Sequence, residues 1–292
     1  MAAQTEVSRL KGLSVDRAAY KTSTRTYTDL PQMPLTPGEP IPNYVSDDDD
    51  DTTCSEKPVV PFSPTASFHI QSDGKSPLSF PLPPKQLQIS ILALESSQPV
   101  YTSIRPNRRF GSCYIVDAKD KSKAAIARTT YNPGPCQEPE VSIGRDGDEK
   151  DADVFEMHSV TMTSRRVEFE SKKHGRFEWR YGKRHERRAA GKVNDLLILE
   201  KISGDARRKV AQLVRSDDTR TPGTKSTYAG NGGRLDIDVD QVNTLLVLAT
   251  VLVMLKKEVD RLRMLQIATM SGVAVVGAEA GATTGVVAAV ES

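Results

Sequence analysis

The chain has 292 residues, of which 37% are hydrophobic and 27% are charged, and its formal net charge is +2. This hydrophobic fraction is below that of a fully globular chain, so we expect part of the sequence to be disordered. A net charge so near zero excludes a global electrostatic field that would point to nucleic acid.

The three cysteines, Cys54, Cys113 and Cys136, are widely spaced and belong to no CxxC motif or Cys/His cluster. Reduced thiols in a cytoplasmic protein fit this pattern. The first twenty residues lack the apolar core of a secretory signal. We therefore expect a cytoplasmic location, with a nuclear or peripheral membrane location as the alternatives.

Residues 1–84 are predicted to form a disordered arm. Proline interrupts residues 30–44 and 57–84 every few positions, and a run of five aspartates lies between them at 47–51. Such sequence buries too little apolar surface to offset the entropy of ordering it. Its PxxP spacing makes SH3- or WW-type proteins candidate partners, and a solvated tail is the alternative interpretation.

A series of short apolar runs with a period of two follows from about residue 86. The clearest is GRFEWRY, in which Phe177, Trp179 and Tyr181 fall on one face of an extended chain and Glu178 lies on the other. Short runs without long helices between them predict an antiparallel sheet, sandwich or barrel. We expect the aromatic face of GRFEWRY to point into the interior of a barrel; stacking of Trp179 on nucleic-acid bases is the alternative.

The patterns account for about ten strands. Two intervening stretches are expected to be irregular: the polar residues 132–153 are predicted as a loop, and the Gly-rich residues 219–238 as a loop or hairpin.

An almost purely apolar run covers residues 242–255 and is followed at once by the charged sequence KKEVDRLR. As a helix, the run is about 21 Å long, too short for the roughly 30 Å core of a bilayer. A helix that is apolar on nearly every face is normally buried on every face. We therefore predict a helix over 240–266, with its apolar part inside a β-barrel; a short or tilted membrane anchor is the alternative.

The ends of this helix carry their own signals. Asp238 or Asp240 is the expected N-cap. Lys256 with Asp260, and Glu258 with Arg261, have the spacing of helical ion pairs. Residues 267–292 are Gly- and Ala-rich and are predicted to form a low-complexity tail, with a membrane-associating helix as the alternative.

The apolar-to-charged transition at 242–263 and the Trp-bearing segment 175–200 together carry a resemblance. They are similar to fungal proteins with a tubby C-terminal-like domain, a superfamily that includes LURP-one-related proteins and phospholipid scramblases. The resemblance covers residues 85–266. It implies a mainly β fold, a roughly twelve-stranded antiparallel barrel wrapped around a central hydrophobic C-terminal helix. The tubby branch implies phosphoinositide binding, and the scramblase branch implies calcium and membrane association.

The strongest candidate site is a basic segment, residues 165–192, which holds eleven Lys/Arg and four Glu, a net charge of +7. The rest of the chain is therefore net acidic. Arg and Lys at strand ends suit phosphate groups on lipid headgroups or nucleic acid. Cations that keep strand edges solvated are the structural alternative. The predicted ligand-binding residues are Arg165, Arg166, Lys172, Lys173, Arg176, Lys183, Arg184, Arg187 and Arg188.

No catalytic arrangement is evident in the sequence. The four histidines have no metal-ligand spacing, and neither a GxSxG elbow nor a P-loop occurs. We therefore expect a non-enzymatic binding module without metal or cofactor, directed at an anionic membrane surface and less so at nucleic acid. The alternatives are a scramblase-like membrane-associated protein and a protein-interaction scaffold that uses the arm.

Overall fold

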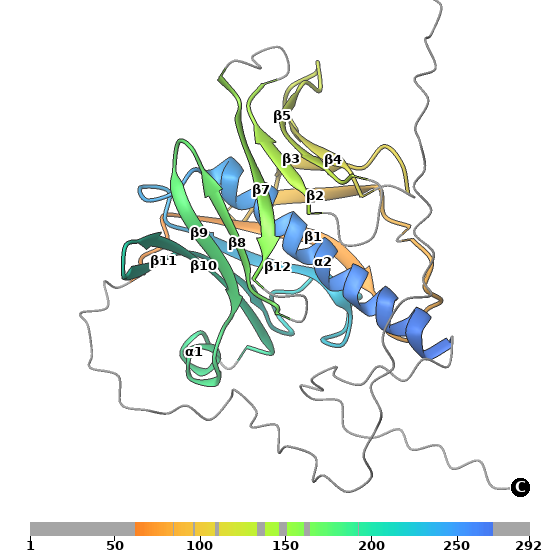
Figure 1. Cartoon of the computed structure of the whole chain (residues 1–292). Coiled ribbons are helices and arrows are strands. Elements are labelled where there is room, and N and C mark those ends of the chain that lie inside the picture. The colour runs from red at the N-terminus through yellow and green to blue at the C-terminus, as the bar shows by residue number, and fades with distance from the viewer. Residues whose placement is uncertain are drawn as a thin grey trace, which may run out of the picture. The chain divides into compact units, whose positions relative to one another are not determined.

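The computed structural model describes residues 62–83, 85–95, 97–108, 111–132, 138–145, 151–160, 164–191 and 193–270. Within them, twelve antiparallel strands form a closed barrel in which each strand pairs with its neighbours in sequence, and β1 closes the ring by pairing with β12. A long helix, α2 (Thr244–Met270), runs through the ring, and the short helix α1 (Arg184–Ala189) follows β9 (Figure 1). The strands are β1 (Ala66–Lys75), β2 (Gln88–Ala93), β3 (Pro99–Ile104), β4 (Cys113–Asp117), β5 (Ala125–Thr130), β6 (Glu140–Ile143), β7 (Asp153–Ser159), β8 (Val167–Ser171), β9 (Gly175–Tyr181), β10 (Asp195–Ser203), β11 (Ala206–Arg215) and β12 (Ala229–Ile237).

The core lies between α2 and the inner faces of the strands. Ten consecutive helix residues, 246–255, are buried, so the helix meets protein on every side. Leu246 and Val251 have no exposed surface, and Leu252 is also buried. The predicted mainly β fold around a buried hydrophobic helix is confirmed. None of the helices in the described part of the chain is both long enough and apolar enough to cross a bilayer.

Period-two alternation places the large side chains of β9 inside the barrel, as predicted. Phe177 and Trp179 are fully buried, and Tyr181 is half-buried beside the core. Glu178 points the other way and is nevertheless buried, because Arg207 covers it with an ion pair of 2.9 Å.

Three strands were not predicted. Residues 66–75 were assigned to the disordered arm but form β1, so the barrel begins before the predicted boundary at residue 85. Residues 140–143 of the predicted polar loop form β6. The Gly-rich stretch contains β12, in which Gly232 and Gly233 let neighbouring backbones approach: a Cβ there would lie 1.8 Å from Ile70 O and 2.5 Å from Val214 O.

The N-cap of α2 is Asn243, not Asp238 or Asp240. Its side-chain oxygen accepts hydrogen bonds from the backbone N–H of Leu245 at 2.8 Å and of Leu246 at 3.3 Å. Asn and Asp are about equally good N-cap residues. Asn243 is the cap because it lies directly before the first helical residue, whereas Asp238 and Asp240 lie farther from it. The helix continues to Met270, four residues beyond the predicted end. Residues 1–61 and 271–292, which hold most of the predicted arm and tail, lie outside the described residues.

Candidate functional site

One end of the barrel, here called the exit mouth, is where α2 leaves the ring. Lys257 Nζ donates to Ser159 Oγ at the end of β7 (2.8 Å), and Arg261 donates to the carbonyl of Ser164 before β8 (3.0 Å). Tyr181, the last residue of β9, donates a hydrogen bond from its hydroxyl to Glu258. The exit mouth therefore gathers the start of β8, the end of β9 and the helix α1 that follows.

A buried ion pair fixes α2 at this mouth. The Arg215 guanidinium at the end of β11 makes two hydrogen bonds of 2.7 Å to the two carboxylate oxygens of Glu258, and the N–H of Gly230 donates to the same carboxylate at 2.8 Å. Burial acts to raise the pKa of Glu258, but attraction to Arg215 and these hydrogen bonds outweigh it and leave the pKa lowered. The predicted pair of Glu258 with Arg261 is therefore wrong, because a buried partner from β11 takes the carboxylate.

The nine predicted site residues do not form one patch. β8 and β9 are paired as a hairpin, with Ser171 opposite Gly175 and Val167 opposite Trp179. The turn holding Lys172 and Lys173 therefore lies at the end of the barrel away from the exit mouth, roughly 20 Å from Arg166 at 3.3 Å per residue. Arg176 lies beside that turn. The other six, here called the α1 surface, belong to the exit mouth: Arg165, Arg166, Lys183, Arg184, Arg187 and Arg188.

The cations of the α1 surface lie mostly in solvent, and Arg165 attracts the nearby carboxylate of Asp195 without contacting it in an ion pair. Five of them are exposed and Arg187 is half-buried. Among the described residues, none of the six forms an ion pair with a carboxylate, whereas Arg176, near the other end, is paired with Glu168. Arg165 lies with its guanidinium 5.4 Å from the centre of the Tyr181 ring. The positive charge of this surface is therefore available to an anion from solution.

Arg180 belongs to the same basic segment but has a structural role. It contacts Glu186 at 2.8 Å and Glu200 at 2.5 Å, and so joins α1 to the wall of the barrel. Burial acts to lower the pKa of Arg180, but these two carboxylates outweigh it and raise the pKa above its ordinary value. Glu186 is thereby occupied by Arg180 and does not neutralise the exposed arginines of its own helix.

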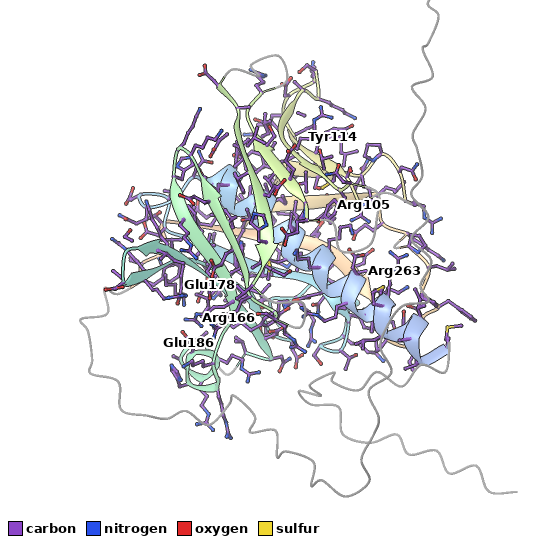
Figure 2. The ribbon with its side chains drawn as sticks, in the orientation of Figure 1. Arg105, Tyr114, Arg166, Glu178, Glu186 and Arg263 are labelled. Atoms are coloured by element: carbon purple, nitrogen blue, oxygen red, sulfur yellow. The ribbon has the colours of Figure 1, made fainter. Side chains whose placement is uncertain are left out.

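A second group of cations lies on the opposite wall of the exit mouth. A pocket of about 60 Å³ opens there between α2 and the strands β1 to β4. In Figure 2, Arg105 and Arg263 lie on one side of α2 and Arg166 on the other. The charged side chains that line the pocket are Arg105, Arg108, Lys256, Asp260 and Arg263.

Sequence reasoning missed this pocket because its members are far apart in the chain. Arg105 and Arg108 follow β3, whereas Lys256 and Arg263 belong to α2. Gly111, before β4, leaves room for the lysine: a Cβ there would lie 2.0 Å from Lys256 Cε. The pocket depends on the closure of the barrel, which no short motif encodes.

Two other predictions concern chemistry. Trp179, weighed as a base-stacking residue against a core residue, is a core residue without exposed surface. Among the described residues, Glu138, Glu156 and His158 place ligand-type atoms within 4.8 Å of one another, an arrangement that the spacing of the histidines alone did not suggest. His158 is hydrogen-bonded to Glu138, and exposed acidic groups of this kind are common without a metal, so we assign none.

Comparison with known proteins adds no identity to this geometry: no family model, no curated protein and no solved structure matches the chain.

Proposed function

We propose that the protein is a non-enzymatic module that binds anionic, phosphate-bearing membrane surfaces through the α1 surface. The observation that supports this most strongly is the set of six cations at one mouth of the barrel without ion-pair partners among the described residues. Near an anionic bilayer each such cation contributes about 1 kcal/mol to binding. The resemblance to the tubby branch, which implies phosphoinositide binding, agrees with this proposal.

A membrane is favoured over nucleic acid by other residues of the basic segment and of the exit mouth. Trp179, the aromatic side chain that could have stacked on bases from within the basic segment, is buried. Large apolar side chains are exposed at the same mouth but across α2 from these cations, on the loop after β1 and on the last turns of α2: Leu78, Phe80, Leu82, Met264, Ile267 and Met270. Cations and exposed apolar groups at the same end of a protein are the combination that a peripheral membrane protein uses.

The scramblase-like alternative requires residues 242–290 to enter lipid. Residues 246–255 are packed inside the barrel, and removing them would expose its core. The scaffold alternative depends on the Pro-rich arm, and most of that arm, including the PxxP spacings within 31–40 and 58–61, lies outside the described residues. No observation in the described part of the chain favours either alternative over membrane binding.

Vesicle sedimentation tests the proposal with a control that the fold supplies. Replacing Arg184 and Arg188 by Gln removes two charges from the α1 surface, and replacing Lys172 and Lys173 by Gln removes two from the opposite end. We expect the first pair to lower partitioning onto phosphoinositide-containing vesicles roughly thirtyfold, at about 1 kcal/mol per charge, and the second pair to change it little.

Binding of the unaltered protein should weaken with added salt, because exposed charges are screened. If both double variants lose vesicle binding equally, binding depends only on the net charge of the protein. That result would contradict the proposal that the α1 surface is the binding site. Retention of RNA or DNA with no vesicle binding would assign the same cations to nucleic acid and overturn the membrane proposal.

A further inference from the structure

The pocket on the opposite wall of the exit mouth is crowded with positive charge. Four cations line it, and its one acid, Asp260, is shared between Lys256 and Arg263. Lys75, just behind this wall, has its pKa lowered by burial and by repulsion from Arg263. Charge of one sign gathered in a recess favours an ion of the opposite sign.

Arg105 gives the pocket a specific donor. Its Nε–H is buried and has no hydrogen-bond partner among the described residues, and its guanidinium forms no ion pair with any of them. Leaving a buried charged donor unpaired costs more than an ordinary lost hydrogen bond. An anion in the pocket removes this cost, and a planar guanidinium suits the oxygens of a phosphate group.

Lys256 is placed to act with Arg105. Its ammonium lies 4.2 Å from the centre of the Tyr131 ring, and Gly111 leaves the space through which the side chain passes. The volume of about 60 Å³ is enough for an anion the size of one phosphate group.

Next to the pocket, the loop after β1 presents its backbone inward and its apolar side chains outward. Lys75 Nζ donates to the carbonyls of Phe80 at 2.5 Å and Leu82 at 2.9 Å, and Gln266 donates to the carbonyl of Ser79 at 2.7 Å. With the backbone held in this way, the side chain of Leu78 is 96% exposed, that of Phe80 72% and that of Leu82 64%. Three such groups at the rim are suited to the acyl region of a bilayer.

We propose that this pocket binds a single phosphate group, through Arg105 and Lys256 with Arg108 and Arg263 at its rim. The phosphate can come from a lipid headgroup or from a free phosphate ester, and the exposed apolar loop provides the means to tell them apart. This inference does not depend on the α1 surface, which lies across α2 on the other wall.

The first test titrates the full chain with inorganic phosphate at constant ionic strength, with acetate as the reference anion. The expected results are a saturable shift of the Arg105 Nε–Hε signal in NMR and one-to-one binding in calorimetry. Arg105→Met should weaken phosphate binding about tenfold or more. It should leave the unliganded protein at least as stable to heat, because the unpaired cation is gone. Lys172→Met, at the far end of the barrel, should bind phosphate as the unaltered protein does.

An Arg105 signal that phosphate does not move, or an Arg105→Met variant that binds phosphate with unchanged affinity, would overturn the site. If the Arg105→Met variant does not fold, the phosphate titration of the unaltered protein, followed by the Arg105 signal, is the test of the site. Failure here leaves the α1 surface untouched, since its test uses other residues.

A second arm identifies the source of the phosphate. Phe80→Ser is compared with the unaltered chain on vesicles of phosphatidylcholine with phosphatidic acid, and in solution with glycerol 3-phosphate. Loss of vesicle binding with unchanged glycerol 3-phosphate affinity assigns the pocket to a lipid headgroup. Unchanged binding in both assays assigns it to a free phosphate ester.

Discussion

The indole N–H of Trp179 donates a hydrogen bond of 3.0 Å to the hydroxyl of Thr250, and so links the wall of the barrel to the middle of its central helix. Both side chains are fully buried. The Thr250 hydroxyl also donates to the carbonyl of Leu246 at 2.8 Å, one turn earlier in α2. The only polar residue in the buried part of the helix therefore faces the only tryptophan of the chain.

Replacing Thr250 by Val should destabilise the protein. The methyl group keeps the volume of the side chain, but the indole N–H is left buried without an acceptor, which costs about 1–3 kcal/mol. Urea unfolding followed by circular dichroism measures this change. Thr269→Val is the matched control, because Thr269 bonds the carbonyl of Leu265 in the same way on an exposed turn of the same helix. A Thr250 variant no less stable than the Thr269 variant would show that the bond contributes nothing.

Replacing Gly230 by Ala should loosen the helix at the exit mouth. An added Cβ would lie 2.5 Å from Val259 Cγ2 and 2.6 Å from Leu255 O, and the backbone has a φ of +71°. We expect a loss of more than about 2 kcal/mol, from strain and overpacking together. Gly175 separates the two causes, since its φ is +90° but nothing lies within 4 Å of an added Cβ. The free energy of unfolding of Gly175→Ala should fall by only about 1 kcal/mol. Equal losses in the two variants would show that crowding against α2 does not contribute to the effect at Gly230.

Replacing Glu258 by Gln should cost about 3–5 kcal/mol at neutral pH, because Arg215 then loses a buried ionic partner. The effect should depend on pH. The pKa of Glu258 is lowered in the folded protein, from its ordinary value of 4.5, so its stabilising contribution is complete above about pH 4.5 and is lost as the pH falls through the folded pKa.

Urea unfolding at a series of pH values measures this difference. The difference in the free energy of unfolding between the unaltered protein and the Glu258→Gln variant should be constant from pH 7 to about pH 5. It should become smaller below about pH 5. Asp195 also contacts Arg215, at 2.5 Å, but burial and the charge of Glu258 outweigh this attraction and raise the pKa of Asp195, so its ionised form stabilises the folded state less than that of Glu258 does. Asp195→Asn should therefore cost much less than Glu258→Gln. A larger loss in the Asp195 variant would contradict this assignment of roles.

The buried helix could be predicted from sequence because its evidence is local. Residues 242–255 have no polar face and are too short for a bilayer, and both facts are visible without neighbours. The inward face of β9 is likewise set by alternation over Phe177, Trp179 and Tyr181. β12 could not be recognised, because its glycines look like loop residues until β1 and β11 are placed against them.

The candidate site was predicted only in part for the same reason. The basic segment is contiguous in sequence, but a hairpin turn sends Lys172 and Lys173 to one end of the barrel and the α1 surface to the other. Arg105 and Arg263 meet at one pocket only because the ring closes around α2. Proximity across a closed barrel depends on the fold of the whole barrel, so the spacing of residues in the sequence does not predict it.

Every surface described above is positioned by the helix inside the ring, and hydrogen exchange of the unaltered chain, read by mass spectrometry, tests that placement most directly. Backbone amides of residues 246–255 should exchange only when the whole barrel unfolds, with protection on the order of 10⁴-fold or more. Those of residues 264–270, on the exposed end of the same helix, should exchange far sooner. Equal and rapid exchange along the whole helix would mean that the barrel does not hold α2, and would contradict the account.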